Sequence, residues 1–386
     1  MPATPPTQFF ATYRGWQWIK HQILTEYITR WARMVGSFAP KIHIVDTFAG
    51  AGHYDGPDGG KVQGSPIIEA RACLVYNGQF SQQSRTMDLF CIEADQENFR
   101  KLEEALNLFG SVVRIRGGDY FIHIPEVLND IKSDPTLVLF DPMGLKPITA
   151  DRCRPLLARA GKTDVFVVVD FQIVHRTSGQ MLPNGDPNPA HKTAAALVAN
   201  LDGFFNTTAW RSIAMNSKLT TADRERLYLD LYFRHVLGER YNFHCAYAVR
   251  ARVGAPPEYW IVNASNNVRA LWLMNDCLAS VDPKLMEKTI TAPNQLTGFV
   301  DAAVEAYRSD VESEFEAAMI ATLDKAGGTL SFAKVSDALL AQFFGRVDEP
   351  AYARVAKRLV KNGRLSRQQR PAAKLDPTEI LSLSTT

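Results

Sequence analysis

Four acidic residues, Asp46, Glu93, Asp119 and Asp141, each lie at or near the carboxyl end of a stretch that the sequence predicts to be a β-strand. In an open α/β sheet, ligands bind beyond the carboxyl ends of the strands. Carboxylates at such ends can accept hydrogen bonds from sugar hydroxyls or from the amino group of a purine. We therefore expect the four acids to lie along one edge of a sheet and to bind a ligand that contains a nucleoside.

A glycine-containing turn follows the first of these strands, with the sequence Asp46-Thr47-Phe48-Ala49-Gly50-Ala51-Gly52. Gly50 and Gly52 permit a tight turn, and a ligand can approach their backbone closely because they lack side chains. Within this site, we assign the ribose hydroxyls to Glu93 and the adenine amino group to Asp119.

Other interpretations of these residues remain open. A strand-ending Asp can simply cap the helix that follows it. The four carboxylates could also suit a magnesium ion, but they come from four separate strand ends, so we expect no metal site. Known phosphate-binding motifs fit less well: Gly59-Gly60-Lys61 precedes Val62 instead of Ser or Thr, and a G-x-G-x-x-G pattern fails at Asp55.

Strands and helices alternate over the first 170 residues of the chain. A helix is predicted over residues 16–34, where apolar side chains recur at helical spacing. The strands and helices that follow it are predicted, in order, at residues 41–46, 65–78, 87–93, 96–110, 111–121, 124–132, 136–142 and 164–171. This alternation predicts an α/β fold, a Rossmann-like parallel sheet with helices on both faces.

The alternation weakens after residue 170. Residues 175–192 are rich in Pro, Asn and Gly and predict a loop. Helices are expected around residues 191–205 and 220–237, and residues 245–252 and 257–265 predict an antiparallel pair of strands.

A second domain is predicted at the C-terminus. Residues 311–327, 331–345 and 349–363 predict three helices, and residues 365–369 and 379–384 could form two short strands. Three helices followed by a hairpin are the layout of a winged-helix domain. We therefore place the α/β domain, with its N-terminal helix, at residues 1–305 and the winged-helix domain at residues 310–386.

The C-terminal domain is locally basic. Residues 351–375 contain eight Lys and Arg and no acidic residue. A basic third helix and wing suit contacts with nucleic-acid phosphates, although a charged helix face can also be merely solvated. The residues that we predict to bind nucleic acid are Arg354, Lys357, Arg358, Lys361, Arg364 and Arg367.

Five short motifs resemble those of a known family. They are Lys20-His21-x-Ile-Leu-x-x-Tyr27, Asp46-x-Phe-Ala-Gly-x-Gly52, Gly64-Ser-Pro66, Phe140-Asp-Pro-x-Gly-Leu145 and Tyr259-Trp-Ile-Val-x-Ala-Ser265. The second resembles the first motif of S-adenosylmethionine-dependent DNA and RNA methyltransferases. Together, over roughly residues 15–285, the five resemble the three-Cys-motif partner protein family.

The resemblance implies a cofactor and a partner. It implies S-adenosylmethionine as the cofactor, a methyltransferase sheet, and an N-terminal helix that packs over the cofactor. It also implies a partner protein of iron–sulfur type with three cysteines. The cofactor-binding residues expected from the strand ends and the resemblance together are Lys20, His21, Asp46, Phe48, Gly50, Gly52, Glu93, Asp119, Tyr120 and Asp141.

The residues at Asp141-Pro142 suggest where the methyl group would be transferred. Methyltransferases that act on exocyclic amines end the fourth strand with Asp or Asn, two prolines and an aromatic residue, and they work mainly by positioning the amine. Here Met143 and Gly144 replace the second proline and the aromatic residue. Tyr120 or Phe171 could supply a stacking surface instead.

Asp141, Pro142 and His175 are the predicted catalytic residues. His175 follows the next strand, and its expected loop position makes it the best candidate for a titrating group. A structural turn at Asp141 and a solvated histidine at position 175 are the alternatives.

The overall composition is that of an ordinary globular protein. The 386 residues carry a formal net charge of +2, so contacts with nucleic acid must come from local patches. The five cysteines are scattered along the chain, and this pattern predicts reduced thiols in the core. We find neither a signal peptide nor a membrane-spanning run, and we expect a cytoplasmic protein.

Three functions are compatible with this sequence. The favoured one is an S-adenosylmethionine-dependent methyltransferase acting on nucleic acid, with an exocyclic amine of a base as one candidate acceptor. The second is a non-catalytic adaptor that binds nucleic acid or the three-cysteine partner. A metal-dependent nuclease is the third.

Overall fold

The computed structural model describes residues 15–56, 59–250, 257–290, 297–367 and 375–384. The chain divides into two compact units, Met1–Leu271 and Trp272–Thr386. This division lies well before the predicted boundary near residues 305–310. The difference arises because helix α12 (Thr297–Lys325) runs without a break through those positions.

The first unit contains a sheet of seven strands in the order β5-β4-β1-β6-β7-β9-β8. Their bounds, in the same order, are Val113–Gly117, Thr86–Glu93, Lys41–Asp46, Thr136–Phe140, Thr163–Val169, Pro257–Ser265 and Phe243–Arg250. The first five strands pair in parallel, and β9 pairs antiparallel with both β7 and β8. The predicted mixed α/β architecture and the antiparallel strand pair are confirmed.

Strand β1 is the point at which the strand order reverses. The chain leaves β1 toward β4 and β5 on one side, and then returns to β6 and β7 on the other. In open α/β sheets, such a reversal opens a crevice at the carboxyl ends of the strands on either side of it. Asp46 ends β1, and Asp141 directly follows β6, so both border this crevice.

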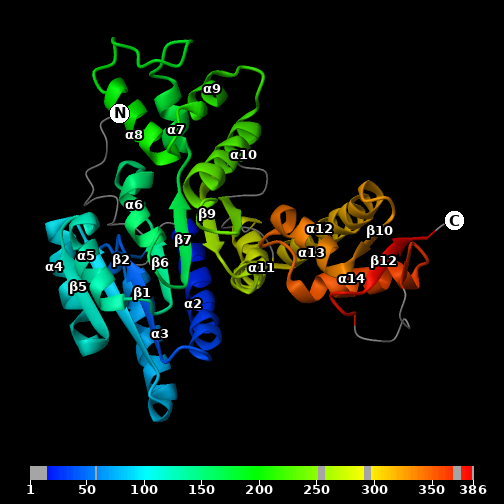
Figure 1. Ribbon diagram of the computed structural model, residues 1–386, viewed down its shortest axis with the longest axis horizontal. Coiled ribbons are helices and arrows are strands. Elements are labelled where there is room, and N and C mark those ends of the chain that lie inside the picture. Colours follow the sequence, from blue (N-terminus) through cyan, green and yellow to red (C-terminus); the bar gives the residue numbers. More distant parts are fainter. Residues whose placement is uncertain (1–14, 57–58, 251–256, 291–296, 368–374, 385–386) are drawn as a thin grey trace. The chain divides into compact units, whose positions relative to one another are not determined.

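Helices cover both faces of the sheet (Figure 1). Side chains of α5 (Tyr120–Ile131) and α6 (Ala150–Leu157) pack with Phe90, Val138 and Val165 in one hydrophobic core. Neighbouring residues along these strands point to the opposite face. There α3 (Ser65–Phe80) packs against β4, and α2 (Gly15–Gly36) packs against α3.

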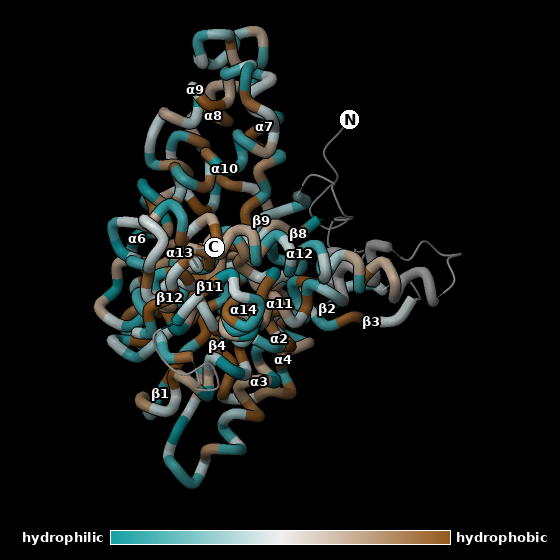
Figure 2. Tube along the Cα trace, turned by 90° about the vertical axis from the view of Figure 1, so that its right-hand side faces the viewer, coloured by the Kyte–Doolittle hydropathy of each residue, from teal (hydrophilic) through white to brown (hydrophobic). Residues whose placement is uncertain are grey.

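A group of helices is inserted between β7 and β8. They are α7 (Gln172–Ser178), α8 (Ala194–Phe205), α9 (Ala209–Met215) and α10 (Thr221–Tyr232), and a π-helical turn (Phe233–Leu237) extends α10. Figure 1 shows these four helices gathered beyond one end of β7, and Figure 2 also shows them grouped together. Because β7 leads directly into α7, this is the carboxyl end of the sheet. The inserted helices therefore form a cap on the side of the strand-end acids.

Two local predictions differ from the structure. Residues 175–178 belong to α7 instead of a loop, because Phe171 and Val174 anchor this short helix in the core. Residues 53–64, which lie between the predicted strand at 41–46 and the predicted helix at 65–78, contain the hairpin of β2 (His53–Asp55) and β3 (Lys61–Gln63), where neither strand was predicted.

The second unit begins within α11 (Val268–Ile290) and continues through α12. Strand β10 (Thr329–Ser331), helices α13 (Phe332–Phe343) and α14 (Glu349–Lys361), and strands β11 (Leu365–Arg367) and β12 (Ile380–Leu383) follow. The strands form an antiparallel sheet in the order β10-β12-β11. The three predicted helices and the hairpin are present, and β10 is an addition.

Candidate functional site

The glycine turn after β1 and the acid at the end of β4 are in direct contact. The backbone N–H of Gly50 donates a hydrogen bond of 2.7 Å to Glu93 Oε2, and the N–H of Asp95 donates one of 2.7 Å to Oε1. Gly50 and Gly52 have φ values of 69° and 79°, which a residue with a Cβ rarely adopts. The turn and the carboxylate thus fix each other.

Glu93 retains the capacity to bind a ligand. Its side chain is only 8% exposed, and burial raises its pKa, although the hydrogen bonds from Asp95 and Gly50 partly offset that effect. A carboxylate can accept about four hydrogen bonds. Backbone N–H groups of Gly50, Asp95 and Ala94 already donate to Glu93, and the remaining capacity of its carboxylate can accept from a ribose hydroxyl.

An ion pair joins helix α2 to the residue that directly follows strand β6. Lys20 Nζ on α2 contacts Asp141 Oδ2 directly after β6, and both side chains are largely buried. Burial alone would lower the pKa of Lys20, but the negative charge of Asp141 outweighs it and raises the pKa above its usual range. Lys20 is therefore charged at every physiological pH and fixes the position of the predicted catalytic acid.

Asp46 lies next to this pair and adds two buried hydrogen bonds. Its carboxylate accepts from the N–H of Phe48 at 3.0 Å and from Ser65 Oγ at 3.2 Å. Burial raises the pKa of Asp46 to about 7, and the hydrogen bond from Phe48 opposes that rise. The side chain of Asp46 thus holds the start of the glycine turn against α3.

Glu69 on α3 faces Asp46 and is fully buried. Burial, followed by the charge of Asp46, raises the pKa of Glu69 well above its usual range. Two carboxyl groups in contact cannot both ionise easily. We expect them to hold one proton between them at neutral pH.

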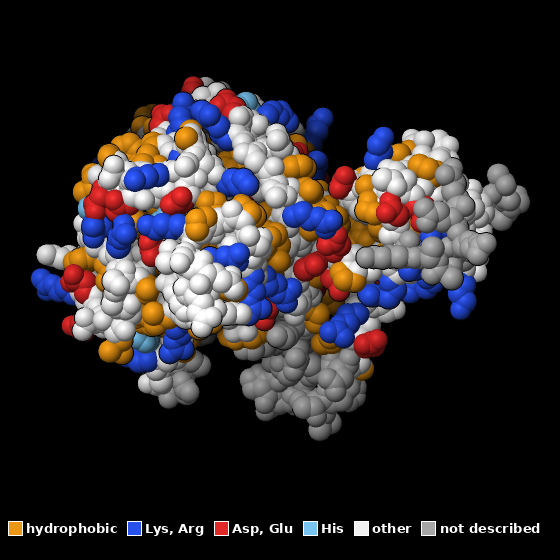
Figure 3. Space-filling view, turned by 60° about the horizontal axis from the view of Figure 1, so that its bottom comes forward, with side chains coloured by type: hydrophobic (Ala, Val, Ile, Leu, Met, Phe, Trp, Pro, Cys, Tyr) orange, Lys and Arg blue, Asp and Glu red, His pale blue; other side chains and the backbone are white. Residues whose placement is uncertain are grey.

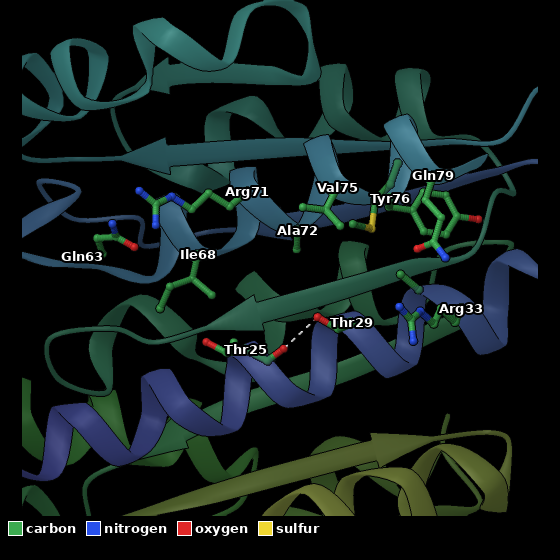
Figure 4. Close-up of a pocket in the computed structure, with 12 residues that line it drawn as sticks. Thr25, Thr29, Arg33, Gln63, Ile68, Arg71, Ala72, Val75, Tyr76 and Gln79 are labelled. Carbon is green, nitrogen blue, oxygen red and sulfur yellow. Dashed lines mark hydrogen bonds between the residues drawn. The ribbon is translucent and has the colours of Figure 1, made fainter. Parts of the chain in front are cut away.

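The packing of α2 against α3 brings Lys20 and Glu69 to the same end of the sheet. Figure 4 shows Thr25, Thr29 and Arg33 along one helix and Ile68, Ala72 and Val75 along the other, with residue numbers rising in the same direction. A groove of about 260 Å³ lies between them. His21, next to Lys20, is buried with its ring 5.8 Å from that of Tyr54, and burial lowers its pKa.

Asp119 occupies the exposed rim of the same sheet edge. It caps α5 by accepting a hydrogen bond of 3.0 Å from the N–H of Phe121, and it forms an ion pair with Arg152 of α6. The Arg152 guanidinium also lies 5.3 Å from the ring centre of Tyr120. Asp119 therefore combines the capping role with the rim position that was predicted for adenine binding.

The predicted aromatic surfaces are enclosed. The Tyr120 ring lies 5.3 Å from Phe48, and its hydroxyl donates to the carbonyl of Pro147 at 3.0 Å. Phe171 lies 5.7 Å from Tyr228 within the cap. Both rings are buried. Neither one presents an open face on which a base could stack.

His175 lies on α7 and faces a buried carboxylate. Its Nε2 is 3.5 Å from Glu225 Oε1 on α10. The side chain of His175 is 21% exposed, whereas that of Glu225 is 3% exposed. The partial exposure predicted for His175 is present, although it comes from a helix and not from a loop.

Three residues of the site were missed by sequence reasoning: Glu69, Arg152 and Glu225. Glu69 is buried on the same face of α3 as Ser65 and Cys73, and Glu225 is buried on the same face of α10 as Tyr228 and Leu229. An acid placed on the apolar face of a helix is a detectable signal. Arg152 gave no comparable signal, because its partner Asp119 is 33 residues away.

The six predicted nucleic-acid-binding residues fall into two classes. Arg354, Lys357, Lys361 and Arg364 have exposed side chains. Arg358 forms two ion pairs of 2.7 Å with Glu312 and Glu316 on α12.

Arg367 is not available to a phosphate. Its guanidinium is paired with Glu379 at 2.5 Å, with the two side chains 1% and 0% exposed. This pairing was not predictable from the sequence, because the partner acid lies beyond the basic stretch, directly before β12.

Three further properties complete the description. All five cysteines are buried and free, as predicted. Within the described ranges, no group of three His, Cys, Asp or Glu side chains could hold a metal ion. None of the helices in the described part of the chain is long and apolar enough to cross a lipid bilayer.

No family model matches the chain, and no curated protein matches it. Among solved structures, protein LPL1258 from Legionella pneumophila aligns at 12% identity over 65% of this chain and 85% of its own, with a TM-score of 0.37. A putative O-methyltransferase from Klebsiella pneumoniae aligns at 14% identity over 69% and 93%, with a TM-score of 0.31. The O-methyltransferase TomG from Streptomyces achromogenes, solved in complex with SAM, aligns at 12% identity over 68% and 94%, with a TM-score of 0.32. At these values, the likenesses do not extend to substrate or mechanism.

Proposed function

We propose that this chain is an S-adenosylmethionine-dependent methyltransferase that acts on nucleic acid. The observation that carries the proposal is the hydrogen bond of 2.7 Å between the N–H of Gly50 and Glu93 Oε2. It joins a tight turn to a buried carboxylate suited to ribose hydroxyls, beside the reversal point of the sheet. Of the candidate cofactors, S-adenosylmethionine fits these residues and the motif resemblance.

Each residue has a definite part in this proposal. Glu93 accepts from the ribose, Asp119 meets the adenine amino group, and Phe48, Gly50 and Gly52 line the approach of the methionine portion. Lys20 and His21 close the site from α2. The bound cofactor would supply an electrophilic methyl group, and Asp141, Pro142 and His175 would face its acceptor.

We also propose that the second unit is a winged-helix domain that holds the nucleic acid. Support comes from the element order α12-β10-α13-α14-β11-β12 and from the exposed Lys357, Lys361 and Arg364. Figure 3 shows Lys and Arg side chains along this unit on the face in view. Membership of the three-Cys-motif partner family, the three-cysteine partner protein and a cytoplasmic location remain proposals that follow from the sequence.

Calorimetric titration tests the cofactor assignment. The wild-type chain should bind S-adenosylmethionine, and Glu93→Gln should weaken binding by about tenfold or more, since a hydrogen bond to a charged group contributes roughly 1.5–3 kcal/mol. Glu97→Gln is the matched control, because Glu97 is exposed and pairs with the exposed Lys101. A wild-type chain without affinity for the cofactor would contradict the proposal.

The second candidate function is a non-catalytic adaptor. It is favoured by Met143 and Gly144, which stand where amine methyltransferases have proline and an aromatic residue, and by the engagement of Asp141 with Lys20. A transfer assay with radiolabelled methyl donor and DNA, RNA or protein separates the two. An enzyme loses transfer but keeps cofactor binding in Asp141→Ala, whereas an adaptor binds the cofactor and transfers nothing.

A further inference from the structure

The cap contains a buried carboxylate that pairs with a histidine. Glu225 on α10 is 2% exposed, and its Oε1 lies 3.5 Å from His175 Nε2 on α7. Removing a carboxylate from water is unfavourable unless a partner compensates it. An imidazole that gains a proton is such a partner. The pair is therefore suited to a histidine that accepts a proton during catalysis.

Other charged groups surround the pair from each element packed against it. Asp170, at the end of β7, accepts a hydrogen bond of 2.8 Å from the N–H of Gln172. Burial raises the pKa of Asp170, and the charge of Glu225 adds to that rise, while Arg176 and His175 oppose it. Tyr228 places its ring 5.9 Å from that of His175. Glu225 and Asp170 are therefore the carboxylates that lie near His175.

Helix α7, which carries His175, packs beside the loop that follows β6. Strands β6 and β7 are parallel neighbours with Phe140 opposite Val167, so the segments that follow them leave the same edge of the sheet. In the loop after β6, a Cβ at Gly144 would lie 3.8 Å from Ile173 Cδ1 on α7. The loop that begins with Asp141 therefore packs against the helix that carries His175.

The chemistry of this arrangement favours one class of acceptor. An amine attacks through a lone pair that is already present, whereas a hydroxyl must lose its proton as the new bond forms. Asp141, which would orient an amine, is instead held by Lys20, and the buried rings of Tyr120 and Phe171 offer no stacking face. A positioned base is what a hydroxyl acceptor requires.

We propose that the acceptor is a hydroxyl oxygen, that His175 removes its proton, and that Glu225 is the residue that positions His175. The hydroxyl oxygen gains the methyl carbon while the methyl–sulfur bond breaks and leaves its electron pair on sulfur. The proton passes to the imidazole, whose positive charge Glu225 stabilises until solvent takes the proton away. This inference rests on the proposed methyltransferase function, and within nucleic acid it points to the ribose 2′-hydroxyl of RNA.

Nuclear magnetic resonance of the full chain with ¹⁵N-labelled histidine tests the pairing without any substrate. The wild type should show a hydrogen-bonded ring N–H signal that His175→Gln removes and thereby assigns. Glu225→Gln should shift or abolish this signal. Asp230→Asn, a carboxyl-to-amide change on the same helix at a residue paired with Arg226, should leave it in place. An unchanged signal in Glu225→Gln would overturn the positioning role.

Methyl transfer to RNA provides the second readout. His175→Gln should lower kcat by about 10²–10⁴-fold, and Glu225→Gln by roughly tenfold, with cofactor affinity unchanged in both. The acidic limb of the pH–rate profile should move to lower pH in Glu225→Gln, because the imidazolium loses its partner, and should stay in place in Asp230→Asn. A methylated base amine as product, or transfer that is equally fast with 2′-deoxy substrate, would overturn the hydroxyl assignment. If the wild-type chain does not bind the cofactor at all, the methyltransferase function itself is refuted.

Discussion

At the level of single residues, the protonation of Asp46 and Glu69 limits what the site can do. Lys20 already pairs with Asp141, and the buried carboxyls of Asp46 and Glu69 lie beside that pair. A shared proton removes one of their two charges. Their state therefore depends on pH in the range in which Asp46, with a pKa of about 7, titrates.

The substitution Glu69→Gln tests this description. Folding raises the pKa of both carboxyls, so the folded chain binds more protons than the unfolded chain between about pH 4 and pH 7 and beyond. The free energy of unfolding must then fall as the pH rises through this interval. A Gln amide at position 69 can donate to Asp46 without any proton from solvent. The variant should thus lose less stability with rising pH.

Urea unfolding at pH 5 and pH 8.5 measures the effect. At pH 8.5, the free energy of unfolding of Glu69→Gln should exceed that of the wild type by an amount on the order of 1–3 kcal/mol, which is the usual cost of a poorly satisfied buried polar group. At pH 5, the two chains should have nearly equal free energies of unfolding. The exposed Glu97→Gln serves as the control and should follow the wild type at both values. Parallel pH dependence in Glu69→Gln and the wild type would show that the two carboxyls do not share a proton.

At the level of elements, the sequence predicted what periodicity and apolar runs can reveal. The strands that end in Asp46 and Glu93 were found because each is an apolar run bounded by a polar turn. Helix α7 was missed because seven residues are too few for a helical period and its stability comes from packing. Strand β10 has three residues and exists only through its pairing with β12, about 50 residues later.

At the site, too, contacts between residues far apart in the sequence could not be predicted. The strand-end acids were predictable because parallel strands bring their carboxyl ends to one edge. The contact between His175 and Glu225 depends on how two cap helices pack, and nothing in a spacing of 50 residues indicates it. Likewise, the basic stretch at the C-terminus gave no sign that Arg367 points into the core toward Glu379.

The buried pair of Arg367 and Glu379 links β11 to the start of the last strand and yields a prediction at this scale. Glu379→Ala leaves the guanidinium without its partner in a buried position, which typically costs about 3–5 kcal/mol. Thermal unfolding of the second unit should therefore move to clearly lower temperature. Arg364→Ala, at an exposed position nearby, should change stability by no more than about 0.5 kcal/mol. If both variants unfold at the same temperature, the pair does not stabilise this sheet.

At the level of the whole molecule, binding of nucleic acid by a chain of net charge +2 must depend on local cations. Lys357 and Lys361 are exposed on α14, whereas Arg358 on the same helix is already paired with two glutamates. Only a cation that releases counterions from the phosphates contributes to the salt dependence of binding. The two lysines should therefore matter more for nucleic-acid binding than the arginine between them.

Fluorescence anisotropy with labelled RNA, over a series of salt concentrations, tests this difference. Replacing Lys357 and Lys361 together by Gln should reduce the slope of log K against log salt by about 1.8 for duplex or about 1.4 for single strands, since each phosphate contact contributes about 0.9 or 0.7. Arg358→Gln should leave the slope almost unchanged, because its charge is already neutralised by Glu312 and Glu316. Equal slopes in all three proteins would mean that α14 does not contact phosphates. Binding would then have to be sought on the first unit.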